Sequence, residues 1–255
     1  MFRKLRILIL LLVLVGVAMN TWLGHLRATD WNSPLWVVIY PINGDGSASA
    51  AATIAELTSD DFSEIDDWFV TQGKRFGREL RSPLIIKLGP VVPELPPAPP
   101  VGGGPFAIGF WSLHFRYWAA THDQFNGPPP NIRMFVLYHA PVGNRPLDNS
   151  LGLEKGQLGV VNAFATPAMR GRNNIVIAHE LLHTLGATDR YDLNTDQPLF
   201  PDGYAEPDRK PLYPQPLAEI MAGRAPLSQT ESEMPEHLAG TFVGARTARE
   251  IRWIE

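Results

Sequence analysis

The sequence predicts an α/β (α+β) fold with a mostly parallel sheet. Through residues 31–186, short apolar runs alternate with longer segments of helical periodicity, an order typical of parallel strands joined by crossover helices. From residue 187 to 233 this regularity is lost, and Pro, Asp, Gly and Tyr become frequent. We therefore expect a large regular part over 31–186, followed by a smaller and less regular part.

The expected strands and helices follow in order from these runs. Residues 35–42 are almost continuously apolar and end at a Gly-Asp-Gly turn, which predicts a buried strand. Residues 106–120 carry bulky side chains at three- and four-residue steps, which predicts a helix packed on the sheet. Apolar residues near the C-terminus, between 238 and 254, are expected to form a helix that packs on the core. The remaining predictions are a helix over 62–80 and strands over 84–88, 132–139 and 157–165.

The N-terminal 30 residues have the composition of an export signal. Three basic residues precede an apolar run over 7–19, and the run extended to 26 reaches the roughly 20 residues that span a bilayer. No convincing cleavage site follows the apolar core, so a membrane anchor over 7–26 is favoured over a cleaved signal or a buried helix. The expected location is extracytoplasmic, anchored in the membrane, or secreted if the segment is cleaved.

Composition excludes some partners. The formal net charge of −4 predicts no general affinity for nucleic acid or anionic lipid. The chain has no cysteine, which does not decide its compartment. Many of its 24 prolines fall in 93–100 and 128–130, which predicts surface loops within one domain.

The segment from His179 to His183 reads His-Glu-Leu-Leu-His and carries the chemistry. Positions four apart share one face of a helix, so both imidazoles can reach one ion, with Glu180 beside them. Hydrolytic zinc takes three protein ligands and a water, which a carboxylate can deprotonate. Asn173 or Asn174 is expected to cap this helix. The alternative is a surface helix whose His and Glu only pair with each other.

A third ligand is expected beyond Gly186, because a glycine there can turn the chain back toward the metal. Asp189 is the favoured residue, and Asp192 lies farther from the turn. Glu206 and Glu219 are alternatives, although prolines argue against a helix around Glu206. The other histidines are expected to be packed or solvated, namely His25, His114, His122, His139 and His237.

This pattern resembles the metzincin metallopeptidases, whose motif is His-Glu-x-x-His-x-x-Gly-x-x followed by a third ligand, usually His. Asp189 at that place is similar to the snapalysin-type branch, which carries aspartate there. The segment 218–224 with Met221 looks like the methionine turn of that family. No tyrosine stands two residues past Met221, so the phenol that some members use there is unassigned, with Tyr191 as a candidate.

The resemblance implies a metzincin-like fold, with a twisted sheet that has an antiparallel edge strand, an upper subdomain over 31–186 and a small irregular lower subdomain over 187–255. It also implies a zinc-dependent endopeptidase. His179, His183 and Asp189 would hold one Zn²⁺, and Glu180 would act as general base. The family's substrate-binding edge strand would map onto Gly159, Val160, Val161 and Asn162, where a peptide or protein substrate adds a strand. Alternatives are a membrane-anchored, non-catalytic zinc-containing binding module and a zinc amidase of a non-protein substrate. Calcium is a weaker expectation, through oxygen ligands in 192–202.

Overall fold

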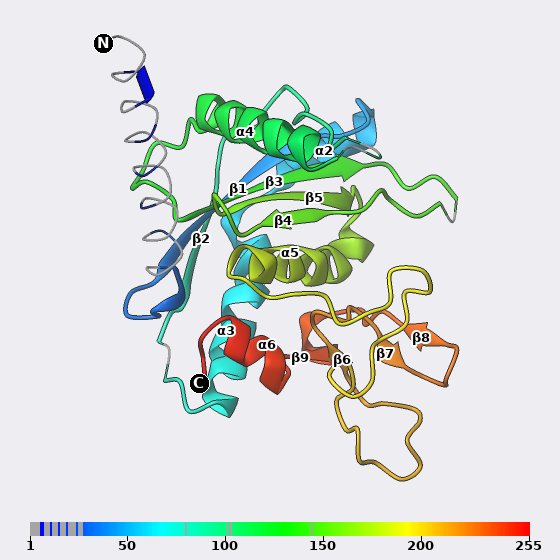
Figure 1. Ribbon diagram of the computed structural model, residues 1–255. Coiled ribbons are helices and arrows are strands. Elements are labelled where there is room, and N and C mark those ends of the chain that lie inside the picture. The colour runs from blue at the N-terminus through cyan, green and yellow to red at the C-terminus, as the bar shows by residue number, and fades with distance from the viewer. Residues whose placement is uncertain are drawn as a thin grey trace.

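The computed structural model describes residues 6, 7, 11, 15, 19, 24, 28–79, 81–100, 102, 104–143 and 145–255. A five-stranded sheet of order β2-β1-β3-β5-β4 forms its centre, with helices on both faces, and a region of short strands and loops lies below it (Figure 1). All neighbouring strands are parallel except β4, which runs antiparallel to β5 at one edge. The predicted mixed α/β class with a mostly parallel sheet is therefore confirmed.

The strands of the sheet lie close to where their apolar runs predict them. Strands 84–88 and 132–139 are confirmed to the residue. The first strand is one residue longer than predicted, and the strand predicted over 157–165 is one residue shorter at each end. The antiparallel edge strand is an additional element, separate from the predicted 157–165. The sheet consists of β1 (Leu35–Asn43), β2 (Leu84–Leu88), β3 (Ile132–His139), β4 (Leu151–Leu153) and β5 (Leu158–Phe164).

The helices depart more from expectation. The helix predicted over 62–80 ends at Arg75, where Gly77 has a φ of 70°, and residue 80 lies outside the described residues. A helix capped by the Ser47 hydroxyl was not predicted from the alanine-rich segment after the first strand. The helices are α2 (Ala48–Glu56), α3 (Ser63–Arg75), α4 (Pro105–His122), α5 (Arg170–Thr184) and α6 (Ala245–Glu250).

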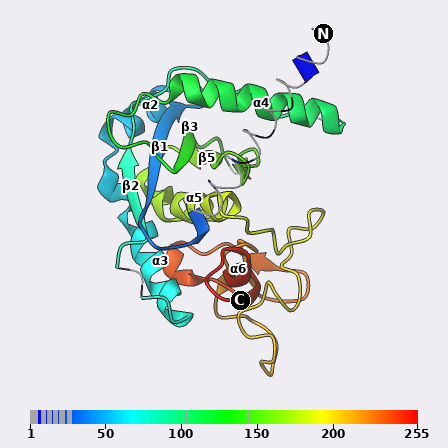
Figure 2. The ribbon, with the colours of Figure 1, turned by 60° about the vertical axis from the view of Figure 1, so that its left-hand side comes forward.

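Two apolar cores cover the two faces of the sheet. In β1, Val37 and Ile39 point into the larger core, which α3, α5 and part of α2 complete, whereas Val38 and Tyr40 point into the smaller core beneath α4. Figures 1 and 2 show α4 and α5 on opposite sides of the sheet. The sheet thus separates α4 from α5.

The C-terminal region is built from short elements. The predicted closing helix is only α6, and the apolar residues before it form a 3₁₀ turn and a strand instead. Buried Trp253 and Ile251 nevertheless return the chain to the larger core. The short strands pair as β6 (Ala218–Glu219) with β9 (Thr241–Phe242), and β7 (Ala225–Pro226) with β8 (Ser232–Glu233).

The proposed anchor, residues 7–26, lies largely outside the described residues. Among the residues that the structure describes, no helix is both long enough and apolar enough to traverse a bilayer.

Candidate metal centre

The centre is built on α5 and on the turn that ends it. The amide of Gly186 donates to the carbonyl of His183 at 3.1 Å, and the amide of Ala187 donates to that of Leu182 at 3.0 Å. This pair of bonds is the Schellman motif, and it requires a left-handed residue, which Gly186 supplies with a φ of 101°. The predicted glycine turn is confirmed, and it directs the chain back along the helix end.

The helix begins differently from the prediction. α5 starts at Arg170, after a 3₁₀ turn over Pro167–Met169, and neither Asn173 nor Asn174 caps it. The side chain of Asn173 instead bonds both the amide and the carbonyl of Phe164 in β5, at 3.0 and 2.9 Å. The side-chain amide of Asn173 therefore links α5 to β5.

Two backbone carbonyls orient the imidazoles. Nδ1 of His179 lies 2.9 Å from the carbonyl oxygen of Ile220, and Nδ1 of His183 lies 2.8 Å from that of Ala187. A carbonyl only accepts, so each Nδ1 carries the proton and each neutral ring presents an Nε2 lone pair. These two Nε2 atoms face each other at 3.0 Å.

Asp189 completes a triangle of ligand atoms. Its Oδ1 lies 3.2 Å from Nε2 of His179 and 3.2 Å from Nε2 of His183. Ligands at the roughly 2.0–2.2 Å bond lengths of zinc, in tetrahedral array, stand about 3.3 Å apart. Within the described part of the chain, these three residues form the one such cluster of His, Asp or Glu. Their geometry and donor types fit a metal ion.

The electrostatics of the cluster favour a cation. Burial lowers the pKa of His179, but its hydrogen bond to Asp189 and the charge of Glu180 outweigh burial and raise that pKa to about 9. Burial raises the pKa of Asp189, yet the two imidazoles pull it well below its usual range. Without a bound ion, a proton supplies the positive charge that this field stabilises.

The segment carrying Asp189 is held by its neighbours. Glu250 of α6 accepts from the amide and the hydroxyl of Thr188, both at 3.0 Å, and from buried Arg190 at 2.6 Å. The amide of Arg190 also donates to the carbonyl of Met221 at 2.9 Å. Glu250 and the carbonyl of Met221 thus fix the chain on both sides of Asp189.

Met221 lies in a tight turn under the centre, fully buried in the larger core. The turn is closed by amides of Ala222 and Gly223, which donate to the carbonyl of Glu219 at 2.9 Å. The buried Glu219 carboxylate accepts from the amide of Met221 at 2.6 Å and from Thr247 of α6 at 2.7 Å. The turn thereby places the carbonyl of Ile220 against His179.

Glu180 lies beside the cluster rather than in it. The residue is 5% exposed, and within the described residues its Oε2 has no hydrogen-bond partner. Burial raises the pKa of this carboxyl, against the opposing influence of the two imidazoles and the Gly152 amide. A buried carboxylate with an unpaired oxygen next to ligand atoms is suited to exchanging protons with a bound water.

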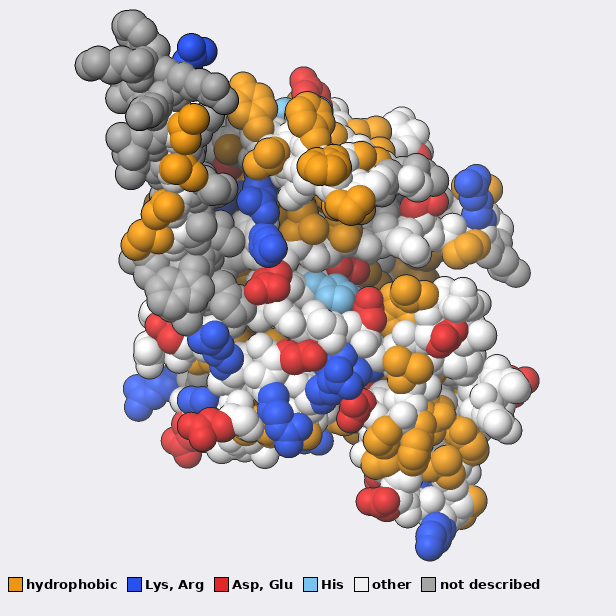
Figure 3. All heavy atoms as spheres, viewed as in Figure 1, with side chains coloured by type: hydrophobic (Ala, Val, Ile, Leu, Met, Phe, Trp, Pro, Cys, Tyr) orange, Lys and Arg blue, Asp and Glu red, His pale blue; other side chains and the backbone are white. Residues whose placement is uncertain are grey.

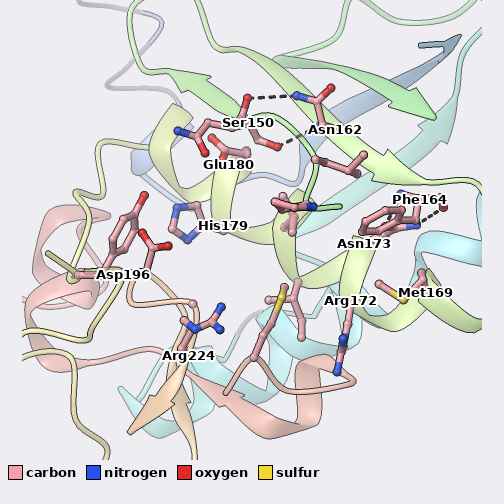
Figure 4. Close-up of a pocket in the computed structure, with 18 of the residues that line it drawn as sticks. Ser150, Asn162, Phe164, Met169, Arg172, Asn173, His179, Glu180, Asp196 and Arg224 are labelled. Atoms are coloured by element: carbon pink, nitrogen blue, oxygen red, sulfur yellow. Dashed lines mark hydrogen bonds between the residues drawn. The ribbon is translucent and has the colours of Figure 1, made fainter. Parts of the chain in front are cut away.

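A cavity of about 690 Å³ opens next to this carboxylate. His179 and Glu180 form one end, and Figure 4 shows Arg224 and Arg172 across the cavity from Ser150 and Asn162. Arg172 is paired with Glu236. Apolar side chains line the space between, namely Phe164, Met169, Ile175, Val176 and Met234. The volume and the apolar walls are those of a ligand site.

The other ligand candidates lie elsewhere. Asp192 accepts from the amides of the turn that follows it, and Glu206 pairs with Arg209. The Glu219 carboxylate accepts hydrogen bonds from amides of its own turn. His122 contacts Glu94 and His139 contacts Asn162. His237 packs on Gly171. In 192–202, the region considered for calcium, Asp202 pairs with Arg246.

The segment predicted as the substrate-binding edge is not an edge. Residues Gly159, Val160, Val161 and Asn162 belong to β5, which pairs with β3 on one side and β4 on the other. Asn162 is further covered, because its amide and side chain bond Ser150, Asp148 and Asn149. The prediction was wrong because the three-residue β4 escaped detection.

Several residues at the centre carried no recognisable signal in the sequence. The carbonyls of Ile220 and Ala187 could come from any residue, and Arg224 stands in an irregular segment. Tyr191 lines the cavity with its ring 6.5 Å from that of His179, and burial with nearby carboxylates raises its pKa to about 12. No pattern in the sequence distinguished Tyr191 from the other tyrosines.

The chain was compared with known proteins. No protein-family model matches it, and no curated protein is significantly similar to it in sequence.

Proposed function

We propose that this protein is a zinc-dependent endopeptidase of the metzincin kind, acting outside the cytoplasm. The observation that carries the proposal is the triangle of His179, His183 and Asp189, whose ligand atoms stand 3.0–3.2 Å apart beside an unpaired Glu180 oxygen. Structural zinc sites are filled by four protein ligands, whereas three ligands leave a position for water. The cavity gives a substrate access to that position.

Each residue then has a definite task. The bound ion would lower the pKa of a water and polarise the scissile carbonyl. Glu180 takes the proton of the attacking water and passes it to the leaving amine, for which its raised pKa suits it. Ile220 and Ala187 hold the imidazoles in the tautomer that binds metal, as carbonyls beside ligating histidines commonly do.

In this proposal, the protein strand that pairs with the peptide substrate is β4. β4 is the last strand of the sheet on the side of α5, and Gly152 lies directly against the carbonyl of Glu180. An extended peptide that pairs with the outer edge of β4 would run across the metal centre and place a side chain in the cavity. This arrangement would select extended backbone rather than one sequence.

The test is metal analysis combined with hydrolysis of casein by the purified full chain. We expect about one zinc per chain, loss of hydrolysis on chelation and recovery with Zn²⁺. Glu180→Gln should retain the metal and lose at least about a hundredfold in rate, because it removes the proton acceptor and no ligand. Glu56→Gln, on the exposed end of α2, is the matched control. Full activity in Glu180→Gln would refute the assignment.

A further inference from the structure

α4 carries a row of exposed apolar side chains that its packing on the sheet does not explain. Phe106, Phe110, Leu113 and Tyr117 are 95%, 75%, 62% and 71% exposed. Their spacing of four, three and four residues places them on one face of the helix, here called the α4 stripe. The expectation that the bulky residues of this helix all pack on the sheet was wrong for these four.

The opposite face of α4 packs against the sheet. Phe115, Trp118 and Ala119 are buried in the smaller core, and Trp111 packs against it. The first six residues of the helix are all exposed, and Figure 2 shows one end of α4 projecting past the sheet. The α4 stripe is therefore not required for the fold of this domain.

The surface around the stripe is suited to an apolar partner. Over its 18 residues α4 contains one Arg, two His and no Asp or Glu. Figure 3 shows apolar side chains gathered over α4, and exposed Val91 and Leu95 come from the loop that precedes it. That loop is tied to the helix by the Trp111 indole, which donates to the carbonyl of Pro97 at 2.8 Å.

Gly24, a described residue of the N-terminal segment, lies near the turn against which α4 packs. Gln157 donates to the carbonyl of Gly24 at 3.4 Å, and neighbouring Gly156 lies against the Arg116 side chain of α4. The guanidinium of Arg116 donates to the carbonyl of Lys155 at 2.6 Å. Within the N-terminal segment itself, the described apolar residues Ile7, Leu11, Val15 and Met19 are 48–55% exposed.

We propose that the α4 stripe is a second membrane contact, which lies in the interface of a lipid bilayer next to the N-terminal segment. Amphipathic aromatic rings are enriched at membrane–water interfaces, and an exposed apolar helix face gains free energy when it is buried at the boundary of the acyl chains. The three aromatic side chains of the stripe offer roughly 450–750 Å² of surface at the 150–250 Å² that an aromatic side chain buries.

This membrane contact would determine which way the metal centre faces. α5 packs on the face of the sheet opposite to α4. A molecule that rests on α4 holds its cavity away from the bilayer, toward substrates in the aqueous phase.

The absence of cysteine permits a direct test with the full chain in phosphatidylcholine vesicles. One cysteine is introduced as Phe110→Cys or, as a matched control, Phe200→Cys, an aromatic residue that is 61% exposed in the irregular region. Each is labelled with an environment-sensitive fluorophore, and lipids with nitroxides on their acyl chains serve as quenchers. We expect a blue shift and at least severalfold stronger quenching at 110 than at 200.

Equal quenching at the two positions, or stronger quenching at 200, would overturn the proposal. A blue shift at 110 that grows with protein concentration and is insensitive to the nitroxide lipids would instead identify a second copy of the chain as the partner, and would also overturn it. As a further check, Phe106→Ser with Leu113→Ser should abolish quenching at 110 while leaving the circular dichroism spectrum unchanged, because both residues are exposed.

Discussion

At the scale of single residues, the candidate centre is a set of acceptors held together by groups that are themselves fixed. Nε2 of both histidines and Oδ1 of Asp189 converge, although none of them can donate once the histidines are neutral. Such a convergence costs free energy unless a cation occupies it. Hydrogen bonds in the surrounding segments hold these three atoms together.

Asp189→Asn tests the third ligand. The amide removes the negative charge and offers a weaker oxygen, so we expect zinc affinity to fall at least tenfold, as measured by competition with a chromogenic chelator. Asp192→Asn is the matched control, because the Asp192 carboxylate accepts hydrogen bonds only within its own turn. Equal loss of affinity in the two variants would remove Asp189 from the ligand set.

Glu250 makes the Asp189 segment sensitive to acid. Burial raises the pKa of Glu250, but hydrogen bonds from Arg190 and Thr188 outweigh burial and lower it below the ordinary value of 4.5. A pKa that is lower in the folded state contributes stability above the ordinary value, and this contribution is lost as the pH falls through the folded value. The contribution is therefore complete at neutral pH.

We accordingly expect Glu250→Gln to lower the urea midpoint at pH 7, with a difference from the unsubstituted chain that shrinks below about pH 4.5. Urea titrations between pH 3 and 7 measure this. A difference that stayed constant across the range would show that Glu250 acts through packing rather than charge.

The sequence revealed those site residues whose signal is local. His179, Glu180, His183 and Asp189 stand within eleven residues, and helix geometry with one glycine turn is sufficient to bring them together. Glu250 was not recognised because it lies 60 residues from Arg190, and charged residues on a terminal helix have no distinguishing pattern. The carbonyl of Ile220 was equally hidden, since every residue has one.

At the scale of elements, continuous apolar runs located the parallel strands, whereas short or polar-faced elements escaped. β4 has only three residues, so no alternation could develop. Asn173 has the chemistry of a helix cap, but its amide bonds the backbone of Phe164 nine residues away, a contact that propensity does not encode. Because β4 was missed, β5 was expected at the edge of the sheet, where the structure places β4.

The contact between β4 and α5 gives a prediction with a matched control. A Cβ on Gly152 would lie 2.3 Å from the carbonyl oxygen of Glu180 and 2.5 Å from Cβ of His183, so Gly152→Ala must displace the strand or the helix. We expect a loss of roughly 1–3 kcal/mol in the free energy of unfolding, as for other overpacked sites. Hydrolysis should fall as well, because the displacement occurs beside Glu180, the proposed general base.

Gly109→Ala is the control for that substitution. Gly109 lies in α4 and a Cβ there would have no neighbour within 4 Å. Alanine should stabilise this helix by roughly 0.5–1 kcal/mol. Denaturant titrations of both variants measure the pair, and the strand contact would lose its significance if Gly152→Ala were as stable as Gly109→Ala.

At the scale of the whole molecule, the centre joins two regions that are otherwise built differently. His179 and His183 belong to the helix beneath the sheet, while Asp189 belongs to the irregular region that follows Gly186. Arg190 links this irregular region to the turn at Met221 and to Glu250 of α6. An ion bound by all three ligands would therefore cross-link the sheet domain to the loops that wall the cavity.

Metal removal should consequently destabilise the whole chain. A ligand that binds only the folded state adds RT ln(1 + [L]/Kd), which is about 2.7 kcal/mol at one hundred times Kd. We expect Zn²⁺ to raise the thermal midpoint of the chelated protein by several degrees, as measured by calorimetry. Glu180→Gln should show the same rise because its ligands are intact, whereas His183→Ala should show little. A rise of equal size in His183→Ala would mean that zinc stabilises the fold from another site.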